Sequence, residues 1–316
     1  MPNQKINKKL LDILVDPISK RKLIRKNNTL ISANSVKYEI ENGVPVFTKL
    51  DPYLEIEAEA WEDEWQKGVT KSALSVYKKN MQIFKKLKFW EESGEAANYI
   101  PTKLTDAVLD IGCGNGVSTS HIRGRRVVGL ELSKKQMIRA KEKFPNNDFV
   151  VGDARKLPFR SDTFDVVVAI NILHHVADPE CILDESYRVL KKGGILYTVD
   201  PNLHNPIGFT GRGLFKLLKL RKVFPTFPQF ALGEDERQFT KGDYYKLFLN
   251  SKFVKWKIIP HRIERLLFFS TILIPALYKI PFYDKMLEFT SIYGNKLVKN
   301  QPFDRFCYFW KAEAIK

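Results

Sequence analysis

One segment, residues 108–116, constrains the fold more than any other part of this 316-residue chain. Residues 108–111 are apolar and β-prone, which predicts a short buried strand. Three glycines then alternate with small residues: Gly112, Gly114 and Gly116. Glycine tolerates positive φ and lets a ligand approach the backbone closely. A helix predicted over 117–122 follows, and a glycine loop between a first strand and a helix is where α/β proteins hold nucleotides.

The spacing of the loop, G-x-G-x-G, argues against two common nucleotide sites. It differs from the dinucleotide fingerprint G-x-G-x-x-G, which disfavours an NAD dehydrogenase, and it lacks the lysine of a phosphate loop. Asp110 places a negative charge before the first glycine, which would repel a pyrophosphate and suits a cationic ligand. Glu131 follows a strand predicted over 126–130, about twenty residues on, where a ribose-binding carboxylate belongs. Glu131 alone does not separate NAD from other adenosine cofactors.

Two more predicted strands lead into polar residues. The stretch 147–151 runs into Asp153 and Ala154. The run 164–170 is continuously apolar, as in a parallel strand buried on both faces, and it leads into Asn171. We expect these polar residues to gather with the glycine loop at the carboxyl edge of one sheet.

In these motifs the chain resembles the class I S-adenosylmethionine-dependent methyltransferases, within the group that includes ubiquinone and menaquinone biosynthesis enzymes. The resemblance covers roughly residues 100–200. It implies an α/β fold with a Rossmann-like seven-stranded sheet and a final antiparallel strand. It also implies S-adenosyl-L-methionine as cofactor and methyl transfer to a small, hydrophobic or lipid- or glycan-linked acceptor. The matching segments are VLDIGCGNG (108–116), GLELS (129–133), GDARKLPF (152–159), FDVVVAINILHHVADP (164–179) and LKKGGILYTVDPN (190–202).

The resemblance also implies which residues contact the cofactor. It puts Asp110 at the methionine end, the ribose hydroxyls on Glu131, and the adenine amino group on Asp153. Each residue has a local alternative, such as a tight turn for the glycines or a helix cap for Asn171. The full set is Asp110, Gly112, Cys113, Gly114, Gly116, Glu131, Leu132, Asp153, Ala154 and Asn171.

A hydroxyl acceptor would need a general base, and three residues are candidates: His175, His204 and Asp200. The pair His174–His175 follows the fourth strand, where we expect a helix to start, and histidine titrates near neutrality. The alternative is that this pair packs and hydrogen-bonds locally. His204 follows the fifth strand and would face the acceptor better than the pair does.

Residues 1–50 form a separate small module in the sequence pattern. It predicts a helix over 5–15, strands near 22–24, 29–32, 36–40 and 44–47, a turn at 27–28 and a hairpin turn at 42–43. The module resembles the zinc-ribbon-like activator subunit of tRNA methyltransferases. Where metal-binding members carry two C-x-x-C knuckles, this chain has Asp16-x-x-Ser19 and Ser32-x-x-Ser35. Serine is a poor zinc ligand, so we predict a metal-free module.

The rest of the chain divides into a helical cap or linker over 51–100 and the methyltransferase domain over 101–316. A helix over 240–250 and strands over 253–259 and 306–314 would complete the sheet. Two insertions, near 202–239 and 264–303, combine aromatic and basic residues. They predict a helical lid over the acceptor, which either packs on the core or also lies on a membrane surface.

The formal charge of +16 is unevenly placed: +6 in residues 1–50, −3 in 51–100, +2 in 101–200 and +11 in 201–316. This excess at the two ends indicates an anionic partner: lipid, a phosphorylated carrier or RNA. We therefore keep an RNA (tRNA or rRNA) methyltransferase as an alternative that we do not favour, and a non-catalytic cofactor-binding partner subunit as another. Three scattered cysteines, and no expected signal peptide or membrane span, predict a cytoplasmic protein, with peripheral contact at the inner membrane face as an option.

Overall fold

The fold is seen in a computed structural model. It describes residues 5–48, 100, 102–204, 239–261 and 309–316, together with 282, 285, 286, 289, 293–297, 299, 304 and 307. The predicted cap over 51–99, and nearly all of the two predicted insertions, lie outside the described residues.

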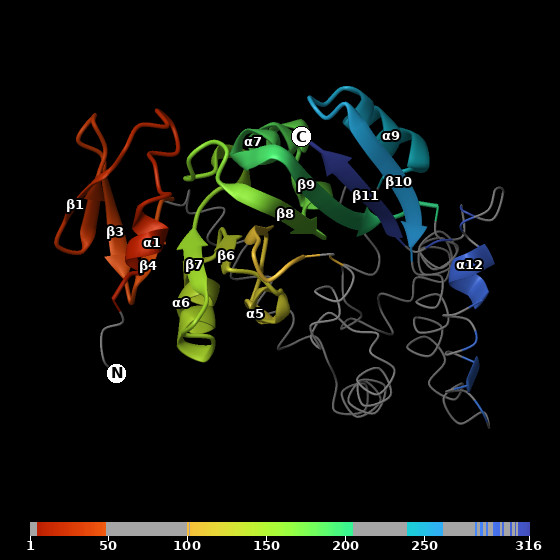
Figure 1. The fold of residues 1–316 in the computed structure, drawn as a ribbon, viewed down its shortest axis with the longest axis horizontal. Helices are drawn as coiled ribbons and strands as arrows, with labels where there is room; N and C mark the ends of the chain where they lie inside the picture. Colours follow the sequence, from red (N-terminus) through yellow and green to blue (C-terminus); the bar gives the residue numbers. More distant parts are fainter. Residues whose placement is uncertain are drawn as a thin grey trace, which may run out of the picture.

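The centre of the molecule is a seven-stranded sheet with β8 in its middle (Figure 1). The five strands from β7 to β9 are parallel, and β11 runs antiparallel to both of its neighbours. This arrangement confirms the predicted Rossmann-like sheet with a final antiparallel strand. In spatial order the strands are β7 (Asp148–Val151), β6 (Arg126–Glu131), β5 (Ala107–Ile111), β8 (Phe164–Ile170), β9 (Leu190–Pro201), β11 (Phe309–Ile315) and β10 (Lys255–His261).

The N-terminal module lengthens this sheet to eleven strands. Its strand β4 pairs in parallel with β7 through Val46 and Val151, at the end of the sheet opposite to β10 (Figure 1). Asn42 and Gly43 both have positive φ, as the predicted hairpin turn requires. The elements of the module are α1 (Lys8–Leu11), β1 (Ile24–Lys26), β2 (Thr29–Ile31), β3 (Lys37–Glu41) and β4 (Val44–Val46).

The predicted helix over 5–15 is only four residues long. It ends at Leu11, with Asp12 as its C-cap, because Leu14 forms an antiparallel bridge with Phe159 and leaves the helical path. The sequence pattern did not predict this pairing with a distant residue, since both partners are single residues and the pairing has no period of its own.

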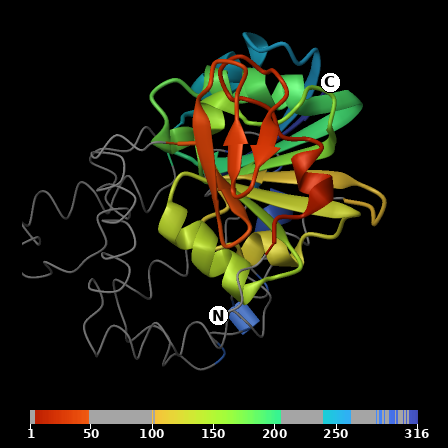
Figure 2. The same cartoon turned by 90° about the vertical axis from the view of Figure 1, so that its left-hand side faces the viewer.

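Helices cover both faces of the sheet. Leu10 of α1 and Ile182 of α7 pack in the main core on one face, and Met137 of α6 packs in a smaller cluster on the other. Figure 2 shows α1 and α6 on opposite sides of the sheet. Alternate residues of β5 supply both sides, because Leu109 belongs to the main core and Val108 to the opposite face. The helices are α5 (Val117–His121), α6 (Lys134–Lys143), α7 (Glu180–Val189), α9 (Lys241–Leu249) and α12 (Asn295–Leu297).

Two single-turn 3-10 helices lie beside the expected site. They are η2 (Ala154–Lys156), after β7, and η3 (Leu173–His175), after β8. The helix expected to start at His174–His175 is thus only one turn, and α7 begins five residues later behind Pro179. In the part of the chain that the structure describes, no helix has the length and apolar character that crossing a bilayer requires.

Candidate active site

The glycine loop needs glycine at two positions for packing and at a third for access. A Cβ on Gly112 would lie 2.6 Å from Cδ1 of Ile172, and one on Gly116 would lie 2.9 Å from the Phe149 ring. Gly114 has no such neighbour, since its nearest contact would be 3.8 Å away. All three have positive φ, between 52° and 75°. The loop is therefore packed from behind at Gly112 and Gly116, while the backbone of Gly114 remains approachable.

Asp110 is buried beneath this loop at the end of β5. Its Oδ2 accepts a hydrogen bond of 2.7 Å from the Thr119 hydroxyl. Burial raises the pKa of Asp110 to about 7; the Thr119 bond opposes this shift and the nearby Glu131 carboxylate adds to it. A cation bound at the loop would favour the ionised form of Asp110, as the predicted methionine-end contact requires.

Glu131 joins the loops that follow β5 and β6. One carboxylate oxygen accepts from the Gly114 amide at 3.1 Å, and the other accepts from the Leu132 amide at 2.6 Å. A carboxylate has about four acceptor sites, so these bonds leave capacity for a further donor. The predicted ribose contact is compatible with this geometry.

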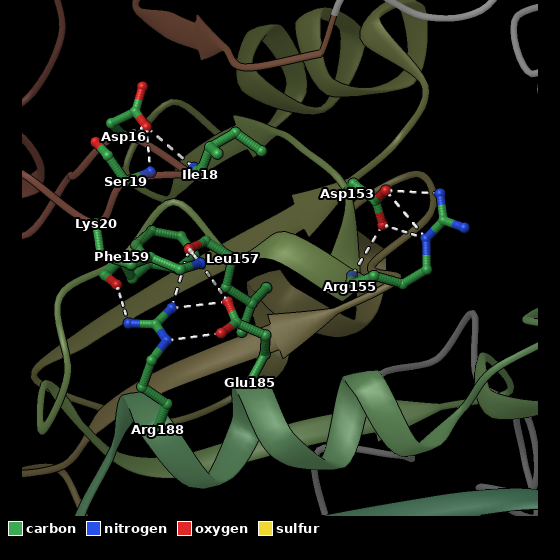
Figure 3. Close-up of polar contacts among 10 residues, drawn as sticks. All are labelled: Asp16, Ile18, Ser19, Lys20, Asp153, Arg155, Leu157, Phe159, Glu185 and Arg188. Atoms are coloured by element: carbon green, nitrogen blue, oxygen red, sulfur yellow. Dashed lines mark hydrogen bonds and ion pairs between the residues drawn. The ribbon is translucent and has the colours of Figure 1, made fainter. Parts of the chain in front are cut away.

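Asp153 caps the single turn η2, and Ala154 is buried beside it. The Asp153 carboxylate also accepts hydrogen bonds from the Arg155 side chain, whose Nε lies 3.0 Å from both oxygens and whose Nη2 lies 2.7 Å from Oδ2 (Figure 3). Burial raises the pKa of Asp153, but these Arg155 bonds lower it further, so the group stays below its ordinary pKa. The sequence did not predict this internal partner at the expected adenine contact.

Two other predicted cofactor residues have well-defined surroundings. Cys113 is buried, with its sulfur 3.7 Å from that of Met137, which suits small filler inside the loop. Burial raises the pKa of the Cys113 thiol well above its ordinary value. Asn171 has a φ of 54°, and its backbone N–H donates to the Val199 carbonyl at 2.8 Å. Asn171 thereby links the end of β8 to β9, next to Ile172 at the glycine loop.

A second group of polar contacts surrounds Asp200, which is fully buried near the end of β9. Its Oδ1 lies 2.9 Å from Nδ1 of His174 and accepts from the His174 amide at 3.2 Å. Its Oδ2 accepts from the Tyr244 hydroxyl at 3.2 Å, and Thr198 in turn bonds that hydroxyl. Burial raises the pKa of Asp200, and the bonds from His174 and Tyr244 oppose the shift. These contacts fix both the carboxylate and the His174 ring.

The three predicted base candidates are not brought together as a set. Asp200 contacts His174, while the ring of the exposed His175 lies beside that of His174, with centroids 3.9 Å apart and ring planes tilted by 40°. His204 is exposed, and its backbone amide donates to the Asn202 side chain at 3.0 Å rather than to Asp200. The sequence pattern could not choose between His174 and His175, and it gave no signal at all for Tyr244.

Comparison with known proteins now adds to this geometry. A family described as a methyltransferase domain matches residues 109–198. A demethylmenaquinone methyltransferase of Chlorobaculum tepidum is 30% identical over 170 residues, which cover 50% of this chain and 69% of that protein. The chain belongs to the class I S-adenosylmethionine-dependent methyltransferases.

Other relatives of this methyltransferase differ in how much they share with it. A 27-O-demethylrifamycin SV methyltransferase of Amycolatopsis mediterranei is 36% identical over 173 residues, and the match spans 48% of this chain and 64% of that relative. Among solved structures, a methyltransferase of Thermotoga maritima (TM-score 0.47, 18% identity) covers 76% of this chain and 96% of its own. A complex of the Haloferax volcanii Trm112 methyltransferase activator with a methyltransferase (TM-score 0.47, 18% identity) covers 78% and 97%.

The residues present fit the cofactor of this family, S-adenosylmethionine. The approachable Gly114 backbone provides a cradle, Asp110 offers a carboxylate to a cationic ligand, and Glu131 has acceptor capacity for hydroxyl groups. Among the described residues, no group of three or more His, Cys, Asp or Glu side chains is arranged to hold a metal ion.

Proposed function

We propose that this protein transfers a methyl group from S-adenosylmethionine to a hydroxyl group of a small, hydrophobic acceptor. Several relatives carry names that point to such acceptors. They include the rifamycin enzyme, whose name places the transfer at an oxygen, the demethylmenaquinone enzymes and a 2-methyl-6-phytyl-1,4-hydroquinone methyltransferase of Oryza sativa. Their names support a ring-bearing, apolar acceptor for this chain.

The observation that carries this proposal is the pair formed by His174 and Asp200. With Nδ1 held by the carboxylate at 2.9 Å, the imidazole exchanges a proton with an acceptor only through Nε2. Asp200 stabilises the imidazolium that forms when the acceptor loses its proton, as a buried carboxylate does behind a general base. A hydroxyl acceptor needs such a base, and the name of the rifamycin relative adds support for oxygen as the acceptor atom.

The donor half of the site holds its ligand with different residues. We propose that the Gly114 backbone and Asp110 receive the methionine end, Glu131 the ribose, and Asp153 with Ala154 the adenine. S-adenosylmethionine supplies a methyl group carried on a sulfonium. The contact between Ile172 and Gly112 brings the segment that leads to His174 against the glycine loop. Catalysis would come mainly from this alignment and from exclusion of water.

We further propose that the acceptor is drawn from a membrane surface. Five large apolar side chains in the C-terminal third are exposed, at intervals of four, three, four and four residues. Lys285 and Lys296 lie over the rings of two of them, at 5.5 and 5.8 Å from the centroids. Apolar side chains flanked by lysines suit an anionic bilayer. The five are Phe282, Met286, Phe289, Tyr293 and Leu297.

The test is radiolabelled methyl transfer from S-adenosylmethionine into fractionated extract and into a panel of hydroquinones and phenols. We expect label in the apolar small-molecule fraction, and loss of that label in an Asp200→Asn variant. Label in the RNA fraction alone would replace this proposal with an RNA methyltransferase. Cofactor binding without transfer to any fraction would indicate a non-catalytic partner subunit. Sedimentation with anionic vesicles tests the membrane contact, and absence of binding would refute it.

A further inference from the structure

The N-terminal module forms backbone hydrogen bonds with the methyltransferase domain both before and after the segment that carries Asp153 and Ala154. On one side, the Phe47 amide donates to the carbonyl of Val151 at 2.9 Å, where β4 meets β7. On the other side, the Val15 amide donates to the Pro158 carbonyl at 3.0 Å, and the Arg160 amide donates to the Ile13 carbonyl at 2.9 Å. The proposed adenine segment, residues 152–156, is thus held between two anchors of the module.

A charged network reinforces the second anchor (Figure 3). Nζ of Lys20 donates to the Leu157 carbonyl at 3.2 Å and forms an ion pair of 2.7 Å with Glu185. Arg188 binds the same Glu185 carboxylate through Nε and Nη2, at 2.7 and 2.8 Å. It also donates to the carbonyls of Leu157 and Phe159, at 3.0 and 2.7 Å. Glu185 therefore orients Lys20 and Arg188 toward the backbone carbonyls that follow the proposed adenine segment.

The network is shielded enough for these charges to matter. The Glu185 side chain is 14% exposed, while Leu157 and Phe159 are fully buried. Burial raises the pKa of Glu185, but the bonds from Arg188 and Lys20 lower it further, below its ordinary value. Loss of one cation would leave a largely buried carboxylate with a single partner, and a backbone carbonyl with one donor fewer.

The turn that presents Lys20 is organised by Asp16. Its buried Oδ1 accepts from the Ile18 and Ser19 amides at 3.0 and 2.6 Å, and its Oδ2 accepts from the Tyr38 hydroxyl at 2.8 Å. Lys20 follows with a φ of 57°, and its amide donates to the Asp16 carbonyl at 2.9 Å. Asp16 stands where metal-binding members of the resembled family carry the first C-x-x-C knuckle. Here its carboxylate closes the turn by hydrogen bonds within the chain.

We propose that the module is a built-in positioning element for cofactor binding, and that Lys20 is the positioning residue that connects its first knuckle to the adenine segment. Lys20 acts through the Leu157 carbonyl and Glu185, and it need not touch the cofactor. The proposal rests on the proposed function, since it takes Asp153 and Ala154 as the adenine contact.

Calorimetric titration of S-adenosylmethionine into the full-length protein tests this proposal, with Lys20→Met and Lys20→Arg variants. We expect Lys20→Met to raise the dissociation constant about tenfold, and Lys20→Arg, which keeps the charge and its donors, to remain within about threefold of wild type. The matched control is Glu41→Gln, which removes another ion pair of the module, 2.7 Å to Lys134 of helix α6, and should leave affinity unchanged.

Hydrogen exchange separates positioning from general destabilisation. In Lys20→Met we expect faster exchange at the amides of residues 154–157, with unchanged protection in β5 and β8. Equal affinity in wild type and Lys20→Met, or a uniform loss of protection across the sheet, would overturn the positioning role. Wild-type protein that binds no cofactor would instead refute the proposed function.

Discussion

Two buried carboxylates at the same edge of the sheet make a useful comparison. Asp110 and Asp200 lie at the ends of β5 and β9, and burial raises the pKa of both. Asp110 has one hydroxyl donor, Thr119, and a like charge nearby at Glu131. Asp200 has three donors, from the ring and amide of His174 and from the Tyr244 hydroxyl.

The two carboxylates therefore differ in how far the protein itself compensates their negative charge. The protein itself supplies the donors that orient Asp200 beside His174, an arrangement that would let this site take up a proton. It supplies only the Thr119 hydroxyl to an ionised Asp110 among the hydrogen bonds described above, so a cation bound there would compensate this charge. In the proposed function the first carboxylate serves turnover and the second serves donor binding.

The largest expected effect comes from Asp200→Asn. The amide keeps the size of the side chain but cannot stabilise an imidazolium at His174. We expect kcat to fall by about 10²–10⁴-fold, the range typical of general acid–base catalysis, with cofactor affinity unchanged. Steady-state kinetics alongside calorimetry would measure both quantities. An unchanged kcat would remove His174 and Asp200 from the mechanism.

The second substitution, Asp110→Asn, should act on the donor. A lost charge-assisted contact of about 1.5–3 kcal/mol corresponds to roughly a 10- to 100-fold weaker affinity for S-adenosylmethionine. The same change should stabilise the cofactor-free protein at pH 8, because the folded state no longer buries a carboxylate. A shift from 3.8 to about 7 corresponds to an upper limit on the order of 4 kcal/mol. Urea unfolding with and without cofactor would show the two opposite signs.

Asp110 also predicts a pH dependence with a definite sign. The pKa is about 7 in the folded protein and 3.8 as its ordinary value, so folding retains a proton between these limits. The stability contributed by this group is therefore full below pH 4 and falls as pH rises toward 7. Cofactor affinity should change oppositely, rising with pH up to about 7, because a cation favours the ionised form. Titrations from pH 5.5 to 8 test this, and Asp110→Asn should flatten the profile.

The smallest effects should come from the supporting hydroxyls. Tyr244→Phe removes one donor from Asp200, and Thr119→Val removes the donor to Asp110. We expect the first to lower kcat a few-fold and the second to change cofactor affinity a few-fold, since a net hydrogen bond contributes about 1 kcal/mol. If the two variants exchanged these effects, the separation of roles would be wrong.

The sequence predicted the strands of this sheet well, because each carries a strong local pattern. The predicted strand over 164–170 is β8 with the same bounds, and the glycine loop falls at the end of β5. The prediction of a helix over 5–15 was wrong at both ends, since the helix spans only Lys8–Leu11 and Leu14 bridges to Phe159, a partner far along the chain. Contacts between distant residues leave no period in a sequence.

The site was predicted unevenly for the same reason. Asp110 lies near the end of a recognisable strand, and Glu131 and Asp153 follow two others, so their place at one edge could be expected. The link from Asp200 to Tyr244 spans two elements with no shared motif, and the Arg155 grip on Asp153 depends on a local turn. The sequence indicated Lys20 only as one of the basic residues of the N-terminal module. Its contact with Glu185 could not be predicted, because that partner lies 165 positions away.

The most direct test of the two-carboxylate account measures both functions in both variants. Calorimetry gives the affinity for S-adenosylmethionine, and a methyl-transfer assay at saturating cofactor gives turnover, for wild type, Asp110→Asn and Asp200→Asn. The account predicts that Asp110→Asn loses affinity and keeps most of its turnover, whereas Asp200→Asn keeps affinity and loses turnover. If Asp200→Asn loses affinity as much as Asp110→Asn does, or if both keep full turnover, the account is contradicted.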